Sequence, residues 1–491
     1  MFQNLSRKVV VDLEYPYNLY LRKNMAQYNE KALDVWKHLS WQTCYCNLDR
    51  LQSRVFKSML LGDIRAVLQV QKLVVRSNSA RFLAIREVTQ LNTSKKISGI
   101  DGKISLSFTE RFELNEYLRL NLNNWKPQTL KSIPKLRKDG TTEFLKVATI
   151  ADRTWQCLIR FALEPVQEAQ ITPYSCSFRQ SHSYFDLQKL LFLNLNSKAY
   201  GIQKRIIEVN LGGCFSLSSH SSLMRKVIAP RGIKLGLYRT LNTGLIPKFS
   251  EPHSSSSPDL SSLLADITLN GIDLIHPSVR YAETLIFLLK PLDNERIIMA
   301  KLNSFLLDLN FDVSLKRVKL TSTLTGFNFL GWFFRVCPNG SFRCTPSVEN
   351  YKTFRKKVKH IVNNSNYGSK VKATKLSPLV KSWRFYHKFC NLDGSRNSLF
   401  YMQRRAFQVF NKETRQDRYS SKKLLDKAFP TLRRFEAGIP LTNIDNSPYS
   451  GHLIYNVYIE DPTFCINRNR KLFPLWPRHN SCIHCGIVTR G

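Results

Sequence analysis

Apolar residues recur at helical spacing between Leu51 and Glu87, and arginines and lysines occupy the opposite face. This spacing predicts amphipathic helices that bury one side. A β region is predicted to open at Ser132 and to run to Ile150, and a helix is predicted over 152–170. Pro165 falls inside that helix, where its missing N–H predicts a kink or an early end.

The middle of the chain carries the clearest strand pattern. Across residues 279–289, apolar and β-branched residues flank a short polar break, which predicts a β-hairpin. Residues 251–262 are rich in serine and hold two prolines, so they are predicted to form a loop. A helix over 293–309 and a pair of strands ending at Phe334 complete the predicted region.

After Thr345 the chain becomes helical in pattern and strongly basic. Residues 351–423 hold 19 lysines and arginines against 3 acidic residues, and their apolar positions recur with the period of a helix. We therefore expect a basic helical domain. A tail richer in asparagine, proline and tyrosine follows from Thr431 to Gly491.

Charge is the unusual feature of the composition. The 491 residues include 74 Lys+Arg against 36 Asp+Glu, a formal net charge of +38, while the 43% hydrophobic content is ordinary. Such an excess predicts a polyanionic partner, with nucleic acid as the first choice. Binding to a membrane surface is the alternative, but no basic amphipathic anchor stands out.

Other composition signals concern the compartment. No run of about 18 apolar residues occurs, so no membrane span is expected, and residues 1–23 lack the apolar core of a signal peptide. The 11 cysteines are mostly scattered, often within apolar stretches, which favours free thiols in a reducing compartment.

The polar break of the hairpin reads Tyr281-Ala282-Glu283-Thr284. It resembles the Tyr-Ala-Asp-Asp box of group II intron reverse transcriptase/maturases, where adjacent carboxylates help to bind a pair of Mg²⁺ ions. Further segments resemble landmarks of that family in the same order, roughly from Trp36 to Pro430. They are residues 36–41, 51–57, 62–65, 71–90 and 99–102, Phe178 with Arg179 and Ser183, Gly213-Cys214-Phe215, and residues 263–267, 326–331 and 381–389.

This resemblance implies an α+β fold with the fingers and palm of a right-hand polymerase and a helical thumb/maturase domain. The implied domains are an N-terminal lead (1–50), an N-terminal segment with a fingers-like region (51–205), a degenerate reverse transcriptase palm (206–345), a basic helical thumb/maturase domain (346–430) and a degenerate C-terminal tail with an HNH-like remnant (431–491).

Three positions that hold aspartates in the family are Asn210, Glu283 and Thr284 here. Two-metal phosphoryl transfer needs carboxylates on adjacent strands, because hard oxygen ligands must neutralise the ions. Glu208 lies two residues before Asn210 on the same strand face, about 6–7 Å away, which is too far to substitute without a register shift. We therefore expect no catalytic residue, no metal site, no cofactor and no enzyme activity.

Other family positions point the same way. The glycine-containing loop that lets primer and nucleotide approach the backbone is replaced by residues 251–258, which hold no glycine. The fingers arginine that would hold the triphosphate aligns with Glu143, and the palm lysine aligns with Arg317. The competing interpretation is a divergent but active reverse transcriptase that uses Glu208, Glu283 and a nearby acid.

Near the end of the chain, Cys482 and Cys485 resemble the first half of the HNH zinc ribbon of that family. A structural zinc ion takes four ligands. His479 and His484 are nearby, but two cysteines and two crowded histidines make a poor tetrahedron. Free thiols are expected, and a shared or intermolecular zinc ion is the alternative.

The basic residues form two candidate RNA-binding groups, one in the N-terminal segment and one in the basic helical domain. Lysine and arginine contact phosphates, and interleaved aromatic residues can stack on unpaired bases. For Trp383 and Phe385, core packing is the favoured alternative. The candidates are Arg65, Lys72, Arg76, Arg81, Arg86, Lys95, Lys96, Lys381, Trp383, Arg384, Tyr386, Lys388, Arg404 and Arg405, with His387 among the interleaved rings.

The resemblance implies an RNA-binding maturase-like protein that assists splicing of a group II-type intron by stabilising the folded, structured intron RNA. A general organellar RNA chaperone is the alternative that also binds RNA. Richness in asparagine, lysine, isoleucine, leucine, phenylalanine and serine indicates an AT-rich organellar genome, with a plastid (chloroplast) first and a mitochondrion second. The sequence does not identify the intron or fix the oligomeric state.

Overall fold

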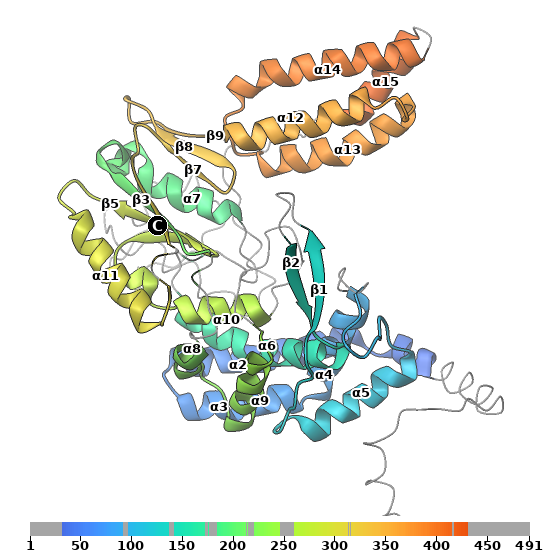
Figure 1. The fold of residues 1–491 in the computed structure, drawn as a ribbon, viewed down its shortest axis with the longest axis vertical. Coiled ribbons are helices and arrows are strands. Elements are labelled where there is room, and N and C mark those ends of the chain that lie inside the picture. The colour runs from blue at the N-terminus through green and yellow to red at the C-terminus, as the bar shows by residue number, and fades with distance from the viewer. Residues whose placement is uncertain are drawn as a thin grey trace, which may run out of the picture. The chain divides into compact units, whose positions relative to one another are not determined.

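The computed structural model describes residues 32–91, 97–136, 142–171, 175, 184–212, 214, 220–245, 260–312, 314, 316–414 and 417–430. They belong to two compact units (Figure 1). Of these residues, those up to Gln170 and those between His220 and Thr268 form the first unit, and the others form the second.

The described part of the first unit is mostly helical. The chain starts with α2 (Trp41–Leu60), α3 (Ile64–Arg76), α4 (Asn78–Arg86), a π-helical segment (Glu87–Leu91) and α5 (Phe108–Asn121). β1 (Lys131–Leu136) and β2 (Thr142–Val147) then pair antiparallel before α6 (Ile150–Gln170). The returning segment adds α8 (His220–Lys226), α9 (Arg231–Asn242) and α10 (Leu260–Leu269). The predicted helical and β patterns of this region are confirmed.

Helix α6 is the centre of the first unit's core. Its predicted apolar side is buried, and so is most of the opposite side, because α2, α3 and α4 all pack against it. Trp155 on α6 stacks on Trp125, with ring centroids 5.6 Å apart and planes inclined by 10°. Gly236 on α9 lies so close that an added Cβ would be 2.6 Å from the Trp155 ring.

Pro165 does not end α6, which continues to Gln170, so the predicted early end is wrong. A proline has no N–H to donate to the carbonyl four residues earlier, and here that carbonyl belongs to Phe161. The buried Gln52 of α2 supplies the missing donor, with Nε2 3.0 Å from the Phe161 oxygen. Gln71 of α3 donates to the next carbonyl, that of Ala162, at 3.1 Å. The Gln52 amide thus replaces the donor that the proline removes, whereas Gln71 adds a side-chain hydrogen bond to the neighbouring turn.

The described part of the second unit begins with α7 (Tyr184–Leu195), two short 3-10 helices (Ser197–Ala199 and Gly201–Gln203) and β3 (Arg205–Asn210). A third 3-10 helix (Ile272–Leu274), β4 (Ser278–Tyr281), β5 (Thr284–Leu289), α11 (Glu295–Asp308) and β6 (Arg317–Ser322) follow. Next come β7 (Phe327–Phe329), β8 (Trp332–Val336) and β9 (Phe342–Pro346). The last helices are α12 (Val348–Asn363), α13 (Ser369–Tyr386), α14 (Asp393–Glu413) and α15 (Arg418–Ala428).

The second unit holds two antiparallel sheets, in the orders β4-β5-β3-β6 and β7-β8-β9. β5 is buried on both faces, which explains its continuous apolar run, whereas the outer strand β6 is largely exposed. Residues of α7 pack with Ile286, Leu288 and the aromatic residues of β7 and β8 in one core. The predicted hairpin, the predicted helix and the predicted strand pair are confirmed within these elements.

Helices α12, α13, α14 and α15 share a separate core, so the predicted basic helical domain is present (Figure 1). Tyr386 at the end of α13 ties this bundle to the second sheet. Its hydroxyl donates to the Leu330 carbonyl at 2.5 Å, and its ring stacks on Trp332 with centroids 4.7 Å apart. The bundle and that sheet are therefore joined by a directional contact.

Replacing Gln52 with leucine is expected to lower the free energy of unfolding by about 2 kcal/mol, because the buried Phe161 carbonyl loses its donor. In a Pro165→Ala background the cost should fall below about 1 kcal/mol, since the new backbone N–H can bond to that carbonyl. A double-mutant cycle by urea denaturation measures the difference. Gln71→Leu is the control, because its cost should not change in the Pro165→Ala background. Strict additivity of Gln52→Leu and Pro165→Ala would contradict the assignment.

Glu164, another buried residue of α6, predicts a pH dependence of stability. Burial raises its pKa from 4.5 to about 7, against the opposing charge of Arg160. The native state therefore keeps a proton that the unfolded chain releases, so this stability is present below pH 4.5 and is lost as the pH rises through about 7.

Glu164→Gln removes that titration. Between pH 5 and pH 8, wild type should lose stability relative to the variant, by about 3 kcal/mol at most. Urea denaturation at several pH values measures this difference, with the exposed Glu116→Gln as control, whose curve should run parallel to wild type. A constant difference between wild type and Glu164→Gln across this range would rule out the raised pKa.

Candidate nucleic-acid interface and the polymerase-like hairpin

The β4–β5 hairpin turns within two residues. Tyr281 pairs with Thr284, which leaves Ala282 and Glu283 in the turn. Ala282 has a φ of 53°, in the left-handed region that costs a residue with a side chain about 1–2 kcal/mol. Because Thr284 also pairs with Asn210 of β3, the structure brings Asn210, Glu283 and Thr284 together at one end of the ladder.

The Asn210 side chain holds the backbone that follows β3. Its Oδ1 accepts a hydrogen bond from the Gly212 N–H at 2.7 Å, and the Leu211 N–H donates to the Glu283 carbonyl at 2.8 Å. A Cβ added to Gly212 would lie 2.8 Å from Glu283 Oε1 and 2.9 Å from Asn210 Oδ1. Both side chains therefore close over a glycine that no larger residue can replace without displacement.

The two acidic residues near the turn, Glu283 and Glu208, have different surroundings. Burial raises the pKa of Glu283, which sits in the turn. Burial also raises the pKa of Glu208, and the ammonium of Lys319, its partner on β6, opposes that shift. Arg317 occupies the position opposite Asn210. Glu208 thus faces a cation rather than the hairpin turn.

This arrangement does not fit a two-magnesium centre. Such a centre needs several charged oxygen ligands around paired ions. The three hairpin positions offer one carboxylate, one hydroxyl and an amide oxygen already bonded to Gly212. Across the residues that the structure describes, no group of three or more His, Cys, Asp or Glu side chains is placed to hold a metal ion.

The candidate RNA-binding residues of the N-terminal segment differ in how exposed their side chains are. Arg65, Lys72 and Arg76 are exposed on α3, while its other face buries Val67 and Val70 in the core. Arg86 is partly exposed, and its guanidinium lies 4.4 Å from the centre of the Trp41 ring. The α3 cations therefore lie on one exposed side of a helix whose valines are buried in the core.

Arg81 is not available to RNA, so its prediction as a contact residue is wrong. It is 4% exposed and donates to Asn115 Oδ1 at 2.9 Å, to the Arg76 carbonyl at 2.6 Å and to Asn78 Oδ1 at 3.2 Å. Burial lowers its pKa. Its guanidinium satisfies local acceptors inside the first unit.

In the second group, Trp383 is also wrong as a candidate contact, and the alternative of core packing is confirmed. It is 7% exposed, stacks on Phe354 with centroids 4.5 Å apart, and donates from Nε1 to Asn350. Core packing does not hold for Phe385, whose side chain is 46% exposed. Tyr386, tied to Leu330 and Trp332, serves the fold and not base stacking.

Two further cations are held by the fold. Arg384 donates to the Pro430 carbonyl at 2.5 Å, and burial lowers its pKa. The Lys388 ammonium lies 4.3 to 4.8 Å from the centres of three phenylalanine rings, and burial lowers its pKa as well. The buried His387 donates from its Nδ1–H to the Trp383 carbonyl at 2.9 Å, and burial lowers its pKa to about 4.

Lys381, Arg404 and Arg405 remain exposed, as predicted for an interface. The sequence reasoning did not single out α12, which carries the densest run of cations in this bundle. The signal was present, because the cations lie one after another on the polar face of an amphipathic helix. They are Lys352, Arg355, Lys356, Lys357 and Lys359.

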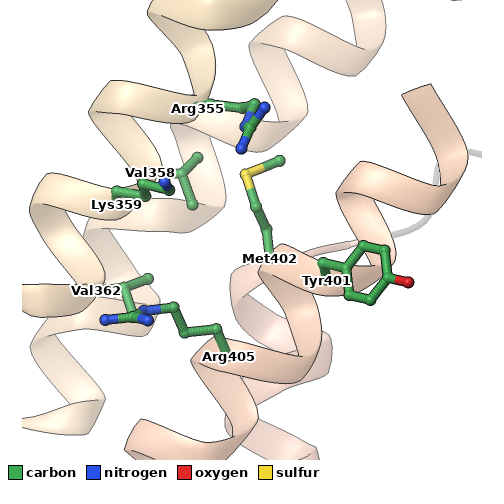
Figure 2. A pocket seen from close by; sticks show the side chains of 7 residues that line it. All are labelled: Arg355, Val358, Lys359, Val362, Tyr401, Met402 and Arg405. Carbon is green, nitrogen blue, oxygen red and sulfur yellow. The ribbon is translucent and has the colours of Figure 1, made fainter. Parts of the chain in front are cut away.

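A groove of about 250 Å³ runs between α12 and α14 (Figure 2). From α12 it is lined by Arg355, Val358, Lys359 and Val362, and from α14 by Tyr401, Met402 and Arg405. The four α12 residues recur at helical spacing and therefore share one face. The groove combines an apolar lining with three cations.

Several predicted positions lie outside the described residues. The strand carrying Glu143 is described but the side chain is not. The positions outside are Lys95, Lys96, Phe178, Arg179, Ser183, Gly213, Phe215, residues 251–259, residues 1–31 and the tail from 431 with His479, Cys482, His484 and Cys485.

Comparisons with known proteins agree along nearly the whole chain. A family model described as the N-terminal domain of reverse transcriptase matches residues 36–118. Maturase-like protein 1 of Euglena gracilis is 41% identical over 467 residues, covering 94% of this chain and 99% of that protein. Maturase-like protein 1 of Euglena longa is 38% identical over 459 residues, covering 92% and 97%.

Introducing carboxylates at Asn210 and Thr284 should create a metal site at the hairpin. In Asn210→Asp/Thr284→Asp, two carboxylates join Glu283 at paired positions, so Mn²⁺ should bind at least about tenfold more tightly than to wild type, as electron paramagnetic resonance can measure. Adding Glu283→Gln to the pair should remove most of the gain. Equal Mn²⁺ affinity of wild type and the double variant would contradict this prediction.

Proposed function

Because the chain belongs to the group II intron maturase family, we propose that it binds the RNA of a group II-type intron and assists splicing by stabilising the folded intron. The observation that carries this proposal is that the chain has exposed cations along α3 and along α12, while its β4–β5 hairpin offers a single carboxylate. The RNA performs the reaction, and the protein contributes binding free energy.

The physical requirement is a difference in affinity. A protein that binds the folded intron but not its misfolded forms shifts the equilibrium toward the folded form, by an amount set by protein concentration and dissociation constant. Cations on helices with packed opposite faces suit this role, because a rigid row of charges matches only some arrangements of phosphates. Flexible cations would bind folded and misfolded RNA more equally.

Loss of reverse transcriptase and endonuclease activities is part of the proposal. Asn210 and Thr284 remove two charged ligands, and the Asn210 oxygen is bonded to Gly212. We assign residues 206–345 as the counterpart of a polymerase palm and 346–430 as the counterpart of the thumb/maturase domain. The four-stranded sheet with its hairpin and the basic bundle α12–α15 support this assignment.

The compartment is also proposed. We place the protein in an organelle, with a plastid ahead of a mitochondrion, because its composition fits an AT-rich genome and both relatives come from Euglena. In the ranges that the structure describes, every helix is too short or too polar to traverse a bilayer.

Pull-down of crosslinked transcripts from the organelle distinguishes the functional alternatives. A single dominant intron would support the maturase, whereas a spread over many transcripts would support a general RNA chaperone. A primer-extension assay with Mg²⁺ and with Mn²⁺ tests for residual polymerase activity, and cDNA product would contradict the loss of reverse transcription.

Replacing Arg65, Lys72 and Arg76 together with glutamine should weaken binding to the folded intron transcript at least about tenfold near physiological salt. The slope of log affinity against log salt should shrink by about 2 to 3, because each lost phosphate contact accounts for about 0.9. Filter binding over a salt series measures both quantities. Lys290, Arg296 and Lys301, three exposed cations at and near α11, give a control of equal charge. An equal loss in that control would show that net charge, and not the α3 row, governs affinity.

A further inference from the structure

The groove between α12 and α14 has an apolar floor, cations around that floor and no acidic residue in its lining. Val358, Val362 and Met402 belong to the core of the bundle and give it an apolar floor. Arg355, Lys359 and Arg405 stand around that floor, and none of the lining residues is acidic. Figure 2 shows Arg355 and Met402 converging from the two helices, with Arg405 across from Val362 and Tyr401 at the outer side.

Two of the cations contact other residues of the bundle. The Arg405 guanidinium donates twice to Asn363 Oδ1, from Nε at 3.2 Å and from Nη2 at 3.1 Å. The Arg355 guanidinium lies 5.9 Å from the centre of the Tyr351 ring. Such contacts reduce the conformational entropy that each long side chain loses when it binds a phosphate.

The dimensions of the groove favour one planar group. A volume of about 250 Å³ is below the ~300–1,000 Å³ of pockets that enclose drug-sized ligands. A double helix cannot enter it, but a single base can. Tyr401, which lines the groove, is 66% exposed, so one aromatic ring is available at its edge.

We propose that this groove binds one unpaired nucleotide of the RNA, with the base against Met402 and Tyr401 and the adjoining phosphates on Arg355, Lys359 and Arg405. The proposal rests on the proposed function and specifies the RNA feature that is recognised. Apolar and aromatic contacts suit a base that has left its stack, and unopposed guanidinium and ammonium groups suit its phosphates. An acidic peptide would match the charge but would leave the aromatic surface without a stacking partner.

This site gives the protein a way to distinguish RNA folds. Bulged or extruded nucleotides are placed by the tertiary structure of an RNA, whereas phosphates are present in every fold. A groove for one such nucleotide therefore adds selectivity to the general affinity that the exposed cations supply.

The test uses the full chain and two RNA duplexes that differ only in one bulged 4-thiouridine. Fluorescence anisotropy should show that wild type binds the bulged duplex about tenfold more tightly than the paired one, the value expected for one stacked base. Irradiation should crosslink the 4-thiouridine to Tyr401 or Met402, as peptide mass spectrometry can establish. Equal binding of the two duplexes, or crosslinks confined to other helices, would overturn the site.

Variants separate the groove from the surrounding charge. Tyr401→Ala/Arg405→Gln changes two exposed residues and should bring the preference for the bulge close to one, and Lys359→Gln should reduce it in the same direction. Lys356→Gln/Lys357→Gln removes two charges from α12 outside the groove and should weaken both duplexes equally, so that the preference persists. An unchanged preference in Tyr401→Ala/Arg405→Gln would count against the proposal.

Binding to the intron transcript separates a failure of the nucleotide site from a failure of the proposed function. If wild type binds the folded intron transcript but shows no preference for the bulge, the nucleotide site fails and the proposed function stands. If wild type binds neither the transcript nor either duplex, the proposed function fails with it.

Discussion

Repulsion among like charges is the constraint on which this structure depends. A net charge of +38 opposes compaction, since every cation brought closer to another costs free energy. The helices meet the constraint by segregation, with cations on the solvent side and apolar residues in continuous cores, as α3 and α12 show. A polyanion laid along those rows removes the repulsion, so the same property that weakens the free protein strengthens the complex.

The hairpin between β4 and β5 is held by backbone and side-chain hydrogen bonds of the protein itself. Carboxylates gathered around metal need the ions to offset their mutual repulsion. Here the neighbouring positions hold an amide and a hydroxyl, and hydrogen bonds join Asn210 to Gly212 and Leu211 to Glu283. The strand pairing of β3 with β5 and the left-handed turn at Ala282 are therefore supported by protein groups.

Local patterns predicted the elements because they record burial along the chain. The period-3.6 spacing of α6 and the apolar run of β5 reflect packing that any neighbour would impose. Whether an individual polar side chain is buried or exposed depends on partners that are distant in the sequence, so the hydrophobic pattern could not predict it. The buried Arg81 donates a hydrogen bond to Asn115, and the Tyr386 hydroxyl donates one to the Leu330 carbonyl. Both partners are far from these residues in the sequence.

The groove shows the same limit for the candidate site. Its two walls come from α12 and α14, with the whole of α13 between them in sequence. The charge of the region pointed to RNA, while the apolar floor that gives the groove its shape exists only after the bundle assembles. The sequence-based prediction of RNA contacts therefore fell on this bundle but included Trp383 and Tyr386, whose rings pack against Phe354 and Trp332.

Pro165 and Gln52 depend on each other, although they belong to different helices. A lineage could accept the proline without penalty only after position 52 had gained an amide, or at the same time. Once the proline was present, reversion of Gln52 became harmful, although the two positions are 109 residues apart. Substitutions at these two positions are thus coupled through the Phe161 carbonyl, so a change at one position alters the cost of a change at the other.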